Sequence, residues 1–198
     1  KARGRPEPSM ALEAALVKLV AGRPAEAVAL TDGIILTDRT SQLAALRLAA
    51  TLEEADEADA AKRLRGRIAL ASGAREDPSL LLPDQAVTTP REGAAHWLGM
   101  LADGFVRIPN GSPPIPMLFA RAAYWLNDED WMARSALVES LDRGGQKAAA
   151  AALLTVDTPL PPVLRMRRAE LLADAGDMMG AAKLGETAVA ADEPGRRP

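Results

Sequence analysis

The sequence predicts an all-helical protein, and three observations support this prediction. The apolar residues, which make up 48% of the chain, are mostly alanine and leucine. Aromatic residues make up only 3%, and runs of β-branched residues are almost absent. Alanine and leucine lose little side-chain freedom in a helix, whereas strands favour branched and aromatic side chains. Apolar residues also recur at helical spacing between glycine and proline breaks.

Four helices are predicted in the first part of the chain. Ser9 is a candidate N-cap for the first helix, and Asp38 is one for the third. Pro24 suits the first turn of the second helix, whose apolar side extends to Ile34 and Ile35. The four helices are expected over about 9–21, 24–35, 41–54 and 57–72.

Proline interrupts the middle of the chain. Segment 73–90 holds three prolines and shows no helical period, and segment 107–116 holds four prolines and an Asn-Gly pair. One helix is predicted between them, over about 91–103. The other helices are predicted over 117–127, 129–142, 146–155, 161–175 and 177–191, which gives about nine to ten helices in all.

These elements predict a division of the chain into successive segments. The numbering begins at Lys1 and not at Met, so we expect that a leader or an upstream domain has been removed. The predicted segments are a disordered lead-in (1–8), N-terminal helical repeats (9–77), a proline-containing connector with one helix (78–116), C-terminal helical repeats (117–194) and a tail (195–198).

Internal repeats are the most informative pattern in the sequence. Three pairs of residues lie 34 positions apart: Ala15 and Ala49, Ala27 and Ala61, and Ile34 and Ile68. The last helix pair repeats the spacing of the first, because Gly22-x4-Ala27-x2-Leu30 is matched by Gly176-x4-Ala181-x2-Leu184. Small residues at such positions let two helices of a hairpin approach closely.

This pattern resembles the tetratricopeptide repeat in a degenerate form. The resemblance covers roughly 9–73 and 159–194, with a looser unit over 117–142, and Asp56 stands where the consensus turn has glycine. It implies an α-solenoid of stacked antiparallel helix hairpins that binds a protein or peptide partner on a concave surface. In the matched registers that surface would include Leu43, Leu46, Glu53, Glu54, Glu170 and Asp174. Solvated acids and core leucines are the alternative interpretation of these residues.

All six aromatic residues lie between positions 97 and 131, next to the single histidine, His96. Tryptophan and tyrosine are enriched at interface hot spots, so this segment is a candidate partner-binding patch. A local core between two helical halves is the structural alternative. The candidate binding residues in this segment are Trp97, Phe105, Tyr124, Trp125 and Trp131.

Several function classes are not expected. The chain has no cysteine, one histidine, and no zinc-protease, P-loop, dinucleotide-binding or G-x-S-x-G motif, so no catalytic, cofactor or metal site is predicted. The net charge of -3 and the dispersed arginines predict no nucleic-acid binding. The sequence has no run of 18 apolar residues, so no membrane span is predicted.

The leading hypothesis is therefore a bacterial scaffold or adaptor that binds a protein or peptide partner through a helical-repeat surface. The alternative is a helical accessory domain of a larger enzyme or a secretion or envelope assembly, whose chemistry lies outside this chain. A small-ligand pocket lined by the aromatic segment is a third possibility. The composition suggests a bacterial source and leaves cytoplasm, periplasm and oligomeric state open.

Overall fold

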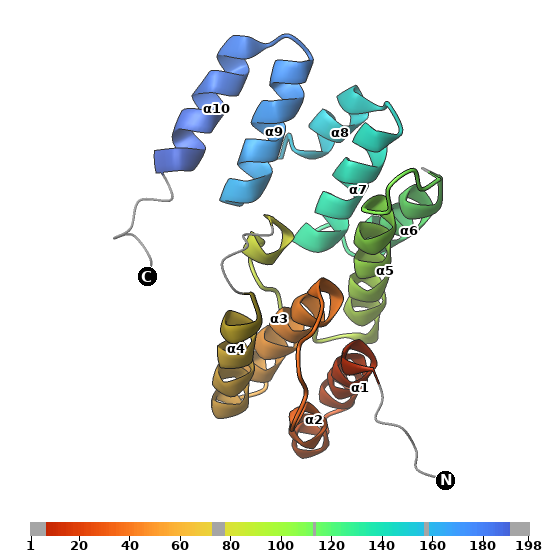
Figure 1. Ribbon diagram of the computed structural model, residues 1–198, viewed down its shortest axis with the longest axis vertical. Helices are drawn as coiled ribbons and strands as arrows, with labels where there is room; N and C mark the ends of the chain where they lie inside the picture. Colours follow the sequence, from red (N-terminus) through yellow and green to blue (C-terminus); the bar gives the residue numbers. More distant parts are fainter. Residues whose placement is uncertain (1–6, 73–77, 113, 157–158, 191–198) are drawn as a thin grey trace. The chain divides into compact units, whose positions relative to one another are not determined.

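The computed structural model describes residues 7–72, 78–112, 114–156 and 159–190 (Figure 1). Within these ranges it contains α-helices, one 3-10 turn (η1) and no strand, which confirms the all-helical prediction. The elements are α1 (Pro8–Val20), α2 (Pro24–Thr31), α3 (Arg39–Glu54), α4 (Ala58–Ser72), η1 (Pro78–Leu81), α5 (Pro90–Val106), α6 (Pro114–Leu126), α7 (Trp131–Arg143), α8 (Lys147–Leu153), α9 (Pro162–Asp174) and α10 (Met178–Ala190).

The chain divides into two compact units. The first contains residues 1–80 and 84–97, and the second contains 81–83 and 98–198. Helix α5 therefore begins in the first unit and ends in the second. Residues 1–6 of the predicted lead-in and the whole predicted tail lie outside the described residues.

In the first unit, α1 pairs with α2, α3 pairs with α4, and α1 packs against α3. Asp38 begins α3 as predicted: its side chain accepts a hydrogen bond from the backbone N–H of Ser41, and the Ser41 hydroxyl accepts one from the backbone N–H of Asp38. This reciprocal capping box satisfies two N–H groups that the helix itself cannot bond. The largest fully buried apolar side chains of this unit are Leu12, Leu48, Leu52, Leu64 and Val87.

In the second unit, α7 pairs with both α6 and α8, α8 contacts α9, and α9 pairs with α10. The carboxylate of Asp130 caps α7 by accepting hydrogen bonds from the backbone N–H groups of Met132 and Ala133, at 2.8 and 3.2 Å. The largest fully buried apolar side chains here are Val138, Leu154, Leu164 and Leu171.

Four helix hairpins share one turn. In each, a residue with a left-handed backbone lies two residues after the end of the first helix, and the next helix starts two residues later. The N–H after the turn residue donates to the carbonyl five residues back, for example from Arg23 to Lys18 at 2.9 Å, as in a Schellman C-cap. The turn residues are Gly22 (φ 71°), Asp56 (61°), Gly145 (75°) and Gly176 (89°). Asp56 thus adopts the conformation that glycine adopts in the other three turns.

The same four hairpins also share two buried positions, at which seven of the eight residues are alanine. One position lies seven residues before the turn residue and the other lies five residues after it, and all eight side chains are buried. They are Ala15, Ala49, Val138 and Ala169 in the first helices, and Ala27, Ala61, Ala150 and Ala181 in the second helices. The internal repeats of the sequence did not reveal the hairpin of α7 and α8, because Val138 occupies the position that alanine occupies in the other first helices.

Three predicted boundaries were wrong. Helix α2 ends at Thr31, so Ile34 and Ile35 lie beyond it, because Gly33 adopts a φ of 69° that interrupts the helix. Helix α1 begins at Pro8, and Ser9 is therefore inside the helix and not its cap. Helix α6 begins at Pro114, before the predicted start, because a proline in the first turn of a helix has no intrahelical hydrogen bond to lose.

Candidate functional site

A groove lies in the first unit between α1 and the beginning of α5. Its volume is about 540 Å³, which is within the usual range of ligand-binding pockets. Helix α1 contributes Met10, Glu13, Leu16, Val17, Val20 and Ala21, and the start of α5 contributes Thr89, Pro90, Gly93, Ala94 and Trp97. Apart from Thr89 and Glu13, the lining side chains are apolar.

Helix α1 can line a groove because it is apolar on two sides. Leu12, Ala15 and Leu19 are buried in the core, whereas Met10 and Val17 are 55% and 67% exposed on the other side. A helix that is apolar all round is normally covered on all sides. The outer side of α1 therefore has the composition of a surface that binds another apolar surface.

The start of α5 is fixed by a second capping box. The Glu92 carboxylate accepts hydrogen bonds from the backbone N–H groups of Thr88 and Thr89, at 2.7 and 3.1 Å, and the Thr89 hydroxyl accepts one from the N–H of Glu92. Burial alone would raise the pKa of Glu92, but the hydrogen bonds from Thr88 and Thr89 outweigh it and lower that pKa. The ionised carboxylate thus holds the first turn of α5, which forms one wall of the groove.

Glu13 is the one acidic side chain among the groove residues, and it is only 17% exposed. Its Oε1 lies 3.5 Å from Nε2 of His96, which is itself 2% exposed, and neither ring nitrogen of His96 makes a hydrogen bond. Among the described residues no other cationic group lies within ion-pair distance of Glu13. A carboxylate in an apolar groove is stabilised by a cation, so the groove favours a ligand that has one.

The predicted aromatic residues do not form one patch. Trp97 lines the groove of the first unit. In the second unit the ring of Phe105 stacks on Phe119 with centroids 5.7 Å apart. The ring centroids of Tyr124 and Trp131 lie 5.6 and 5.2 Å from Cζ of the buried Arg134 guanidinium.

Trp125 differs from these aromatic residues because it is 77% exposed. The rings of Tyr124 and Trp131 form cation–π contacts with Arg134, whose Nη2 also donates to the Asp128 carbonyl at 2.7 Å. These two residues thus make contacts within the second unit, whereas Trp125 is on its surface.

The residues predicted from the repeat resemblance also divide. Leu43 is 5% exposed and belongs to the core, Leu46 is half-buried and Glu54 is exposed. Glu53 forms an ion pair with Arg65 at 2.9 Å, and this hydrogen bond lowers the pKa of Glu53. None of these residues lines the groove.

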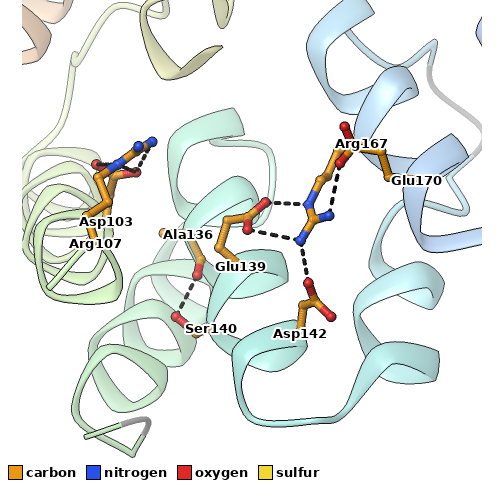
Figure 2. A network of polar contacts seen from close by, with 8 residues as sticks. All are labelled: Asp103, Arg107, Ala136, Glu139, Ser140, Asp142, Arg167 and Glu170. Atoms are coloured by element: carbon orange, nitrogen blue, oxygen red, sulfur yellow. Dashed lines mark hydrogen bonds and ion pairs between the residues drawn. The ribbon is translucent and has the colours of Figure 1, made fainter. Parts of the chain in front are cut away.

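The two acids predicted in the second unit are engaged in ion pairs within the chain. Glu170 pairs at 3.0 Å with Arg167, which also binds Glu139 and Asp142 across from α9 to α7 (Figure 2). Asp174 pairs with Lys147 at 2.6 Å, and the hydrogen bond from Lys147 lowers the pKa of Asp174. These contacts connect α7, α8 and α9.

Sequence reasoning missed the residues of α1 that line the groove. The available signal was that Met10, Val17 and Val20 lie on the side of α1 opposite Leu12 and Ala15, so that too much of the helix surface is apolar for a helix with one buried side. Trp97 was among the predicted candidates, whereas the α1 residues across the groove from it were not. Glu13 has no distinguishing feature in the sequence.

The described residues contain no cluster of three side chains suited to hold a metal ion. In the same part of the chain, none of the helices combines the length and the apolar character needed to cross a bilayer. No protein-family model, curated protein or solved structure matches this chain. The groove's own geometry and chemistry are therefore the basis on which a function is proposed.

Proposed function

We propose that this chain is a helical-repeat binding protein, similar to tetratricopeptide-repeat scaffolds, and that the groove between α1 and α5 takes a segment of a protein partner. The observation that carries the proposal is the groove itself: an apolar surface with one partly buried carboxylate, Glu13. The bound segment would present apolar side chains along one face and a lysine or arginine toward Glu13. Helix-in-groove binding of this kind is a common mode of peptide recognition.

The four hairpins with a common turn support the repeat part of this proposal. Three of the four hairpins pair two buried alanines, for example Ala15 and Ala27. In the first unit α1 packs against both α2 and α3, so the α1 wall of the groove does not have to become ordered when a ligand binds. The Glu92 capping box contributes to the same rigidity at the groove wall.

Fluorescence of Trp97 tests the proposal. The chain has three tryptophans, so replacing Trp125 and Trp131 by Phe leaves Trp97 as the reporter of the groove. The probe is a synthetic helical peptide of about 15 residues with leucines at i, i+3 and i+7 and one lysine on the same face. We expect saturable binding, and weaker binding of the peptide in which glutamate replaces the lysine.

A pair of variants provides the control. Ala94 and Ala25 are both exposed helix residues, but Ala94 lines the groove and Ala25 lies on α2 outside it. Ala94→Arg should fill the groove, pair with Glu13 and abolish binding, whereas Ala25→Arg should bind as the parent does. Equal binding by both variants, or no preference for the lysine peptide, would contradict the proposal.

A further inference from the structure

A second apolar surface lies on α6, in the second unit. The inward side of α6 is buried through Pro116, Ala120 and Ala123. On the outward side, Ile115, Leu118 and Trp125 are 47%, 68% and 77% exposed. These three residues are spaced at i, i+3 and i+10, so they share one face of the helix, which we call the α6 stripe.

Arg121 gives the α6 stripe a positive charge. It is exposed and lies three residues after Leu118 and four before Trp125, so it borders the same face. Among the described residues Arg121 pairs with no carboxylate, and α6 contains no acidic residue. Antiparallel pairing of two α6 stripes would bring two Arg121 side chains together near the middle, and like charges in an apolar interface are unfavourable.

The groove of the first unit complements the α6 stripe in both length and charge. At 1.5 Å per residue, the stripe from Ile115 to Trp125 is about 15 Å long, and the groove along α1 from Met10 to Ala21 is about 16 Å long. The stripe is apolar and is bordered by Arg121, which pairs with no described carboxylate, and the groove is apolar with one partly buried carboxylate. The positive charge of Arg121 thus complements the negative charge of Glu13.

We propose that the groove of one copy of this chain binds the α6 stripe of a second copy, with Arg121 of the second copy paired to Glu13 of the first. This proposal rests on the proposed function, because it names the partner of the same groove. Glu13 is about 4.5 Å along α1 from Met10, and Arg121 is about 6 Å along α6 from Trp125. The two charges therefore meet when α6 runs antiparallel to α1, with Trp125 near Met10 and Leu118 near Val17.

The contact joins two different surfaces of the chain, the groove of the first unit and the α6 stripe of the second. Two copies that exchange these contacts reciprocally form a closed two-fold dimer, whereas one-way contacts build rings or open chains. A helix face of about 15 Å also places the contact at the small end of specific protein interfaces. The assembly should therefore depend strongly on protein concentration.

Charge exchange on the full chain tests the proposed pairing. Sedimentation equilibrium over a range of concentrations should show association of the native chain. Glu13→Arg and Arg121→Glu should each weaken the association constant by about tenfold or more, because each places like charges at the contact. The double variant should restore it, whereas Arg63→Glu on the exposed face of α4 should leave it unchanged.

Disulfide trapping tests the register, since the native chain has no cysteine. Val17→Cys and Leu118→Cys chains, one of them tagged, are mixed and mildly oxidised. We expect the mixed dimer to exceed both homodimers, and Ala25→Cys in place of Val17→Cys to remove this excess. Random pairing of the two variants would overturn the proposed contact.

A native chain that stays monomeric at millimolar concentration, or a double charge variant that does not recover, would also overturn the self-association. In that case, the lysine peptide is titrated and Trp97 fluorescence is measured. Saturable binding would then support the groove as a binding site for a different protein. Absence of both self-association and peptide binding would end the proposed function as well. Circular dichroism of each variant identifies any that has lost its helices. The Arg121→Lys variant keeps the positive charge and should therefore retain most of the association.

Discussion

Two glycines of the first unit should respond in opposite directions to the same substitution. Gly22 closes the first hairpin with a φ of 71°, whereas Gly66 lies within helix α4 and has an ordinary helical backbone. A Cβ atom added at either position meets no atom within 4 Å. The environment around the new methyl group is thus empty in both cases, and only the backbone conformation differs.

The magnitudes follow from this difference. An L-residue in the left-handed region costs about 1–2 kcal/mol, so Gly22→Ala should destabilise the first unit by about 1 kcal/mol or more. Alanine in a helix interior is about 0.5–1 kcal/mol more favourable than glycine, so Gly66→Ala should stabilise the unit by about that amount. The two variants should therefore differ by about 2 kcal/mol in the free energy of unfolding.

Urea unfolding followed by Trp97 fluorescence measures this difference. Trp97 belongs to the first unit, and replacing Trp125 and Trp131 by Phe removes the signal of the second unit. Unchanged slopes with shifted midpoints would show that the two variants alter stability and not the extent of unfolding. If both substitutions moved the midpoint in the same direction, the turn geometry assigned to Gly22 would be wrong.

Three further variants test other parts of the fold by the same measurement. Asp56→Gly should stabilise the first unit by about 0.5 kcal/mol, because Asp56 adopts a left-handed backbone (φ 61°) that glycine tolerates better; a loss of stability would contradict this. Ala27→Leu should destabilise by about 1–3 kcal/mol, because Ala27 is 0% exposed where α1 and α2 meet; a neutral result would show that the crossing has room. Glu92→Gln should cost about 1 kcal/mol at neutral pH, because a neutral amide oxygen replaces the charged carboxylate that accepts from the Thr88 and Thr89 N–H groups. Because the folded state lowers the pKa of Glu92, its contribution is present above the ordinary glutamate pKa and is lost as the pH falls through the folded value. The parent and Glu92→Gln chains should therefore converge in stability at acid pH, and a constant difference would refute the role of the ionised carboxylate.

The sequence predicted the helices well where the signals were local. The helical pattern of alanine and leucine and the cap at Asp38 gave α3 almost to the residue. The error at α2 arose because Ile34 and Ile35 continue the apolar period after the backbone has turned at Gly33. The hairpin of α7 and α8 was missed because Val138 fills a position that the repeat consensus reserves for a smaller residue.

The candidate site was less predictable, because it depends on which helix faces remain uncovered. Trp97 was selected as an aromatic residue, but its groove exists only because the start of α5 lies beside the outer side of α1. The acids Glu53 and Glu170 were selected by their register in the repeat; Glu53 pairs with Arg65 of the neighbouring helix α4, and Glu170 pairs with Arg167 of its own helix α9. A pair between two helices, such as Glu53 with Arg65, has no local signature in a single sequence.

Glu13 offers a test that separates a binding residue from a structural one. Glu13 is a carboxylate that is 17% exposed in an apolar groove, and among the described residues its neighbour within ion-pair distance is His96 at 3.5 Å, so few groups offset the burial of its charge. Glu13→Leu should therefore stabilise the free chain, by about 1 kcal/mol, while it weakens binding of the lysine peptide. Binding residues commonly show this opposition between stability and function, because the group is suited to the complex and not to the free protein. A Glu13→Leu chain that is less stable than the parent would instead make Glu13 a structural partner of His96, and the charge of the groove would then lose its role in selecting the ligand.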